Sequence, residues 1–135
     1  MKTIEIPNSV ISEMVEHARE GHPNEVCGIV AGKDFASSHA YRMTNTEPSP
    51  VSYQMDPKEQ LRVEKNMREQ GEKMLAIYHS HPDSEAYPSA KDAREAYQWN
   101  WNALYIIIGM IKNTPSIRAF SIEDGRIDEI TVKPL

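Results

Sequence analysis

The sequence predicts a fold of the α/β or α+β class, built around one mostly mixed sheet. Helical and strand-like segments alternate along most of the chain, and three strand-like segments follow one another at its end. This pattern favours a sheet with helices packed against it. The 135 residues fit a single domain, residues 1–135, and are enough to form one hydrophobic core.

The predicted strands are short apolar or alternating segments bounded by turn residues. They are expected at residues 3–6, 26–31, 38–43, 74–78, 104–109, 117–122 and 126–132, with a further extended segment at 51–55. Glu123, Asp124 and Gly125 predict a hairpin turn between the last two strands.

Three helices are predicted from apolar residues at helical spacing and from residues that favour helix ends. Asn8 or Ser9 is expected to cap the first helix. Asp56 and Pro57 predict the start of the second, because Asp is a good cap and Pro suits the first helical position. The helices are expected at about residues 8–20, 56–70 and 89–98.

Charge and cysteine content exclude several classes of protein. The chain has 15 Lys and Arg against 20 Asp and Glu, a net charge of −5, which argues against a nucleic-acid partner. Cys27 is the only cysteine, so an intrachain disulfide and a Cys-x-x-Cys metal site are impossible. The N-terminal residues lack the apolar region of a secretory signal, and the strongly apolar residues 103–108 are too few to span a bilayer. These observations predict a cytoplasmic protein without a membrane partner.

Two histidines define a candidate metal site. His79 and His81 follow the strand expected at 74–78, and residues two apart on a strand point the same way, with α-carbons ~6.5–7 Å apart. Two imidazoles placed in this way can bind one ion at ~2.0–2.1 Å. A pair of solvated histidines is the commoner situation for an isolated His-x-His, so this motif alone does not define a site.

Ser89 and Asp92 fit two interpretations. Ser-x-x-acid at the start of a helix is a capping arrangement. The seven residues that separate His81 from Ser89 include Pro82 and Pro88, and such a loop can also bring the helix start back beside the strand end. Asp92 would then supply a third metal ligand. Two histidines and one carboxylate leave a fourth tetrahedral position for a water whose pKa zinc lowers to ~7.

Glu25 is the best candidate for the general base that such a water requires. It immediately precedes the apolar strand expected at 26–31. A solvated glutamate at a strand edge would occupy the same place in the sequence, and the residues alone do not separate the two interpretations. Cys27 follows on the same strand, where a buried free cysteine usually packs as a small hydrophobic residue.

The candidate residues together resemble a known family signature. Glu25, then His79-Ser80-His81, seven residues, Ser89, two residues and Asp92, is similar at every position to the signature of the JAMM (MPN-plus) metallopeptidases. Residues 23–28 and 115–125 also resemble small bacterial members, and the resemblance covers the whole chain. It implies a cytidine deaminase-like fold, with a curved mixed β-sheet flanked by helices.

The resemblance also implies roles for these residues. His79, His81 and Asp92 would bind one Zn²⁺ per chain, Glu25 would activate the bound water, and Ser89 would donate a hydrogen bond to the oxyanion. The implied reaction is hydrolysis of a peptide or isopeptide bond after the C-terminal glycine of a ubiquitin-fold protein. A sulfur-carrier protein ending in Gly-Gly is the expected substrate, and a small amide is the alternative.

Two other functions are compatible with this fold. A catalytically silent MPN scaffold would only bind protein partners, but such scaffolds typically lack part of the metal set, which is complete here. A nucleoside deaminase needs His-x-Glu together with Pro-Cys-x-x-Cys, and a chain with one cysteine cannot provide it.

Two further features concern substrate binding. The segment at 51–55 is the candidate sheet edge for an extended substrate. Trp99 and Trp101 are candidates for stacking on a substrate, but packing between a helix end and the next strand is the expected role.

Overall fold

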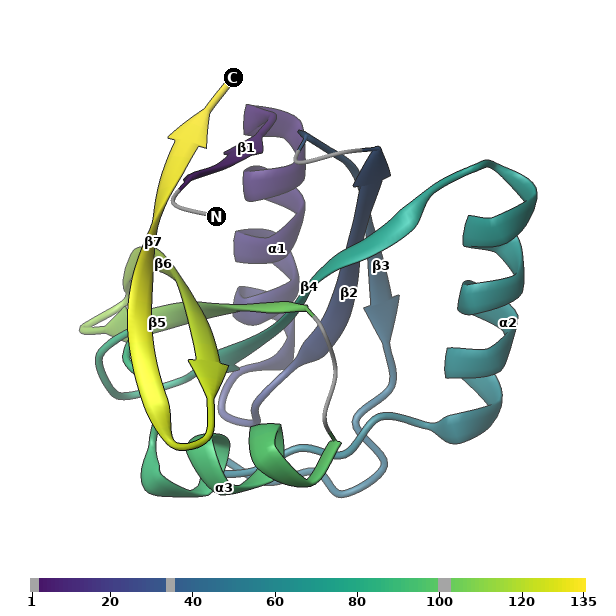
Figure 1. The fold of residues 1–135 in the computed structure, drawn as a ribbon. Helices are drawn as coiled ribbons and strands as arrows, with labels where there is room; N and C mark the ends of the chain where they lie inside the picture. The colour runs from purple at the N-terminus through teal and green to yellow at the C-terminus, as the bar shows by residue number, and fades with distance from the viewer. Residues whose placement is uncertain (1–2, 34–35, 100–102) are drawn as a thin grey trace.

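The computed structural model describes residues 3–33, 36–99 and 103–135 (Figure 1). The elements along the chain are β1 (Thr3–Ile6), α1 (Asn8–Gly21), β2 (Cys27–Lys33), β3 (Ala36–Met43), α2 (Pro57–Glu69), β4 (Lys73–His81), α3 (Ala90–Trp99), β5 (Leu104–Ile111), β6 (Thr114–Glu123) and β7 (Arg126–Pro134). The predicted helices and the seven predicted strands are confirmed, with small shifts at their ends. No helix in the described ranges is both long and apolar enough to cross a membrane.

The strands form one mixed sheet that closes on itself. Its order is β1-β3-β2-β4-β5-β6-β7, and β1 pairs in parallel with both β7 and β3. At its centre, β4 lies between β2, which is antiparallel to it, and β5, which is parallel. The expected mixed sheet flanked by helices is therefore confirmed. The closure was not predicted, because it depends on the pairing of β1 with β3, two segments far apart in sequence. Among the described residues, Glu5 pairs with Ala36 there.

Hydrophobic cores lie on both faces of the sheet. One core surrounds α1, which Figure 1 shows between β5–β7 and β2–β4, and its buried helix residues are Val10, Met14 and Ala18. The core on the other face includes Met67 of α2 and Ala96 of α3. Successive strand residues point to opposite faces, so the residues of β4 divide between the two cores. Tyr78 belongs to the α1 core, and Ile77 belongs to the core that α2 and α3 cover.

The predicted N-terminal cap of α2 is present in the structure, whereas the predicted cap of α1 is not. The Asp56 cap is confirmed, because its carboxylate accepts a hydrogen bond from the Lys58 N–H at 2.9 Å. The predicted cap of α1 by Asn8 or Ser9 is wrong. Both residues are already helical, Pro7 occupies the cap position, and no side-chain cap hydrogen bond is made there.

The hairpin turn between β6 and β7 is confirmed. Glu123 and Arg126 pair across its base, and Asp124 and Gly125 have φ angles of 50° and 79°. Two consecutive positive φ angles are typical of the type I′ turn that suits the twist of a hairpin.

The segment at 51–55 is not a strand of the sheet. It is the returning arm of a loop, residues 45–55, which joins β3 to α2 and which we call the 45–55 loop. Asn45 and Met55 pair across its base in an isolated antiparallel bridge. The loop buries Tyr53 and Met55 and exposes Val51.

Candidate metal centre and catalytic site

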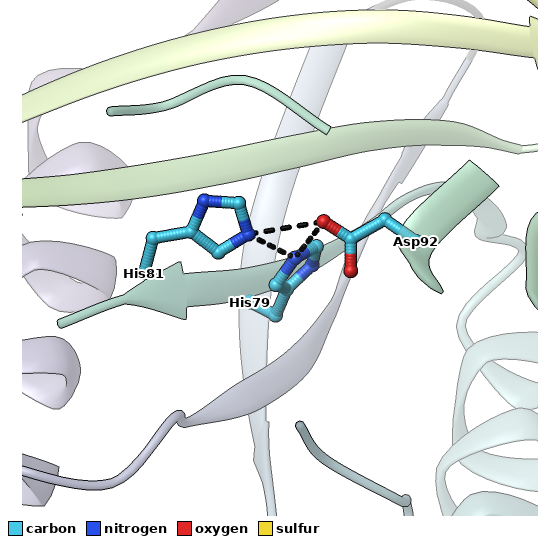
Figure 2. Close-up of side chains that lie close together, drawn as sticks. All are labelled: His79, His81 and Asp92. Carbon is cyan, nitrogen blue, oxygen red and sulfur yellow. Dashed lines mark hydrogen bonds and ion pairs between the residues drawn. The ribbon is translucent and has the colours of Figure 1, made fainter. Parts of the chain in front are cut away.

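His79 and His81 lie at the C-terminal end of β4, and Asp92 lies in the first turn of α3. The Nε2 atoms of the two histidines are 3.2 Å apart. The Asp92 Oδ2 atom lies 3.2 Å from His79 Nε2 and 3.0 Å from His81 Nε2 (Figure 2). Both imidazoles are buried, and the Asp92 side chain is only 10% exposed. The structure thus brings the three predicted ligands together, with one atom of each facing a common point.

The helix cap and the carboxylate position at Asp92 depend on each other. The Asp92 N–H donates a hydrogen bond to Ser89 Oγ at 3.0 Å, and the Ser89 N–H donates one to Asp92 Oδ2 at 2.8 Å. The predicted capping arrangement is therefore present. The oxygen that accepts the Ser89 N–H is the same one that faces the histidines, so the cap orients the carboxylate toward them.

The charge of the Asp92 carboxylate is stabilised by its neighbours. Burial would raise its pKa, but attraction to His79 and hydrogen bonds with His79, His81 and the Ser89 N–H outweigh burial and hold the pKa well below its usual range. Asp92 is therefore ionised at neutral pH, as a metal-binding carboxylate must be.

His81 is oriented by a backbone contact. Its Nδ1 atom lies 2.8 Å from the Glu85 carbonyl oxygen, which leaves Nε2 free to bind a metal when Nδ1 carries the proton. The loop that supplies this carbonyl packs directly against Gly109, the neighbour of His81 on β5. A Cβ atom at Gly109 would lie 2.5 Å from the Ala86 nitrogen, so only glycine permits this close approach.

His79 is held by packing. Its ring stacks on Tyr53 of the 45–55 loop, with ring centroids 4.8 Å apart and an interplanar angle of 27°. Its Nδ1 atom is buried and has no hydrogen-bond partner among the described residues. The contact with Tyr53 was not predicted, since nothing in the local sequence shows that this loop folds back over β4.

Glu25 is buried, which makes the solvated strand-edge interpretation wrong. It is 5% exposed, and its Oε1 atom has no hydrogen-bond partner in the described part of the chain. Burial raises the pKa of Glu25 to about 7, although His79 and His81 pull it down. A carboxyl group with such a pKa can both accept and return a proton near neutral pH.

Ser80, in the middle of the His-x-His motif, connects β4 to the segment that carries Glu25. It is buried, its Oγ accepts the Val26 N–H at 2.9 Å, and its own N–H donates to the Val26 carbonyl at 3.1 Å. No role was predicted for Ser80. Strand alternation was the available signal, because it turns Ser80 away from the histidines and toward the opposite face.

Cys27 pairs with His79 across β2 and β4 but is not one of the three clustered ligands. Cys27 is fully buried, burial raises the pKa of its thiol to about 12, and it therefore packs as a neutral core residue. Trp101 and the side chain of Trp99 lie outside the described residues.

Ser89→Ala tests the role of this hydroxyl, which accepts the Asp92 N–H and keeps its own O–H available as a donor. If the hydroxyl donates to the oxyanion, we expect turnover to fall by roughly 10²–10³. If Ser89 only caps α3, the loss is about 1 kcal/mol of stability with unchanged turnover. Melting and rate measured on one preparation separate the two outcomes.

Comparisons with known proteins show the family of this chain. A family model described as prokaryotic homologs of the JAB domain matches residues 7–123. The CysO-cysteine peptidase of Mycobacterium tuberculosis is 38% identical over 123 residues, which cover 89% of this chain and 83% of that protein. A probable TtuB-protein conjugate cleaving protease of Thermus thermophilus is 34% identical over 122 residues, which cover 90% and 77%. The chain therefore belongs to the prokaryotic homologs of the JAB domain.

Solved structures show the same fold. The solution structure of a protein from Desulfitobacterium hafniense is 35% identical, has a TM-score of 0.88 and covers 98% of this chain and 92% of its own. A structure described as JAMM, a metalloprotease-like zinc site in the proteasome and signalosome, shares the fold at a TM-score of 0.61 and 14% identity, with 98% of each chain covered. The family match and the peptidase relatives together make the chain a JAMM-type peptidase.

Proposed function

We propose that this chain is a zinc-dependent peptidase or isopeptidase that hydrolyses the amide bond after the C-terminal glycine of a ubiquitin-fold protein. A sulfur-carrier protein adduct is the proposed substrate. The observation that carries the proposal is the meeting of His79 Nε2, His81 Nε2 and Asp92 Oδ2 at one buried point. Ser80, between the two histidines, bonds to Val26, the residue next to the buried Glu25.

The donor set fits a catalytic zinc site. Two neutral imidazoles and one carboxylate are a common set for such sites, and they leave one coordination position for water or substrate. Zn²⁺ bound by His79, His81 and Asp92 would polarise a water and lower its pKa to ~7.

Two residues of the chain would carry out proton transfer and stabilise the developing negative charge. Glu25 accepts a proton from the attacking water and returns it to the leaving amine, which its raised pKa suits. The Ser89 hydroxyl donates a hydrogen bond to the oxygen on which negative charge develops. The Ser89–Asp92 cap keeps the metal-binding carboxylate and this donor in fixed relation.

The 45–55 loop offers backbone groups that can bind an extended substrate tail beside the metal site. The N–H and the carbonyl of Tyr53 make no hydrogen bond to the described residues, while the Tyr53 ring stacks on His79. An extended peptide can pair with such free backbone groups, as in strand addition to a sheet edge. Two glycines would let the substrate backbone approach the metal closely, because they have no side chains.

The relatives support the substrate class by their names. One is a CysO-cysteine peptidase, and another is a probable TtuB-protein conjugate cleaving protease. Both names describe cleavage of something joined to a protein, which matches a carrier-protein adduct better than a free small amide.

The test uses three forms of one ubiquitin-fold carrier, ending in Gly-Gly-Cys, Gly-Ala-Cys and Ala-Ala-Cys, together with the dipeptide Gly-Cys. We expect the Gly-Gly-Cys form to be cut after its last glycine and the other two carriers to be cut much more slowly, as read by mass spectrometry. Equal cleavage of all three carriers, or none of the first, contradicts the proposed tail. Cleavage of Gly-Cys as fast as the carrier would point to a small-amide substrate.

A further inference from the structure

Asn45 uses the full hydrogen-bonding capacity of its side-chain amide on backbone groups. Its Nδ2 atom donates to the carbonyl oxygens of Glu25 at 3.0 Å and Ser52 at 3.3 Å. Its Oδ1 atom accepts the N–H groups of Glu47 and Gln54, each at 3.0 Å. An amide group has two donors and two acceptor positions, so all four are occupied.

These four bonds join two parts of the site that are far apart in sequence. Three of them are made within the 45–55 loop, which places the Tyr53 ring on His79. The fourth holds the carbonyl of Glu25. A second contact lies beside it, because the Glu25 N–H donates to the Ser49 carbonyl at 2.8 Å. The backbone of Glu25 is therefore held from both sides by this loop.

We propose that Asn45 is a positioning residue that fixes the Glu25 carboxyl and the Tyr53 ring in one arrangement relative to His79. The effect of Asn45 on catalysis rests on the proposed function. Its effect on the position of the Tyr53 ring does not depend on any activity. Only an amide meets the requirement. Aspartate keeps both acceptor positions but has no donor at neutral pH, and alanine removes all four bonds.

The experiment compares Asn45→Asp, Asn45→Ala and Thr46→Val in the zinc-loaded full chain. Thr46 is the matched control. Among the described residues its Oγ1 bonds only to the Gln54 carbonyl in the same loop, at 3.2 Å, and its backbone N–H keeps a bond to that carbonyl. The readouts are kcat, KM, zinc content and the NMR chemical shifts of the His79 ring protons. The stacked Tyr53 ring changes these chemical shifts. Tyr53→Leu gives the His79 shifts without that ring.

We expect both Asn45 variants to keep their zinc and to lose roughly 10²-fold in kcat, because a small misplacement of a catalytic group costs about that much. Their KM should change far less. The His79 ring protons should move toward the values seen in Tyr53→Leu. Thr46→Val should match the parent protein in kcat and in His79 shifts.

The inference is overturned if Asn45→Ala melts earlier but keeps the parent kcat and the parent His79 shifts. It is equally overturned if Thr46→Val moves the shifts as far as Asn45→Ala does. Should Asn45→Ala not fold, Asn45→Asp decides alone, because it preserves the bonds to Glu47 and Gln54. If the parent protein cuts no carrier, the proposed function fails, and the His79 shifts still decide whether Asn45 places Tyr53.

Discussion

Glu25→Gln is expected to retain zinc and to lose turnover by roughly 10²–10⁴, the contribution typical of a general acid–base group. Glutamine has nearly the same size and shape, so the metal ligands and the buried packing should be preserved. Its amide cannot accept a proton from water. The carboxyl that it replaces is buried and has a pKa raised to about 7, in the range where proton acceptance and return are both feasible.

The matched control for this change is Glu85→Gln. The Glu85 side chain is exposed in the loop beside His81, and it is the Glu85 backbone carbonyl, not its carboxylate, that contacts the histidine. This control should retain both zinc and rate. Rate measurements and elemental analysis on the two variants decide the role of Glu25, and full activity in Glu25→Gln would rule it out as the base.

Loss of metal is the expected result of removing any one predicted ligand. The purified protein should carry about one zinc ion per chain, and His79→Ala and Asp92→Ala should each lose most of it together with activity, because two remaining ligands hold the ion too weakly. Elemental analysis after dialysis measures this directly. Full zinc in both variants would show that these residues do not bind the ion.

Asp92→Asn separates the two roles of this residue. An asparagine oxygen can still accept the Ser89 N–H, so the cap of α3 and the melting temperature should be largely preserved. The negative charge is lost, and zinc content should fall as in Asp92→Ala. His22→Ala is the control for loss of an imidazole, since His22 is exposed and should not change the zinc content.

Features that depend on local sequence were predictable. His79 and His81 point the same way because they are two apart on a strand, and the cap at Ser89 and Asp92 needs only a helix start. The Asp56 cap and the turn at Asp124 are local in the same sense. Each follows from the conformational preferences of a few consecutive residues.

Features that depend on contacts between distant segments were not predictable from residue patterns alone. Glu25 is buried, and the 45–55 loop, some twenty residues further along the chain, bonds to both sides of its backbone. Tyr53 reaches His79 only through the fold of that same loop. The closure of the sheet depends on the pairing of β1 with β3, which the described residues show at Glu5 and Ala36 and which no periodicity reveals. The predicted α1 cap was wrong for a local reason. The helix starts at Asn8, one residue earlier than a cap at Asn8 and two residues earlier than a cap at Ser9 would need.

The two histidines come from a strand at the centre of the sheet, whereas the carboxylate comes from the first turn of a separate helix, α3. Among the α3 side chains whose burial is described, Ala96 alone is buried. An ion that binds His79, His81 and Asp92 together would therefore act as a cross-link between α3 and β4. Binding of the ion and packing of α3 against β4 would then be thermodynamically coupled. A chelator that removes the ion would therefore also loosen α3, which forms one wall of the site.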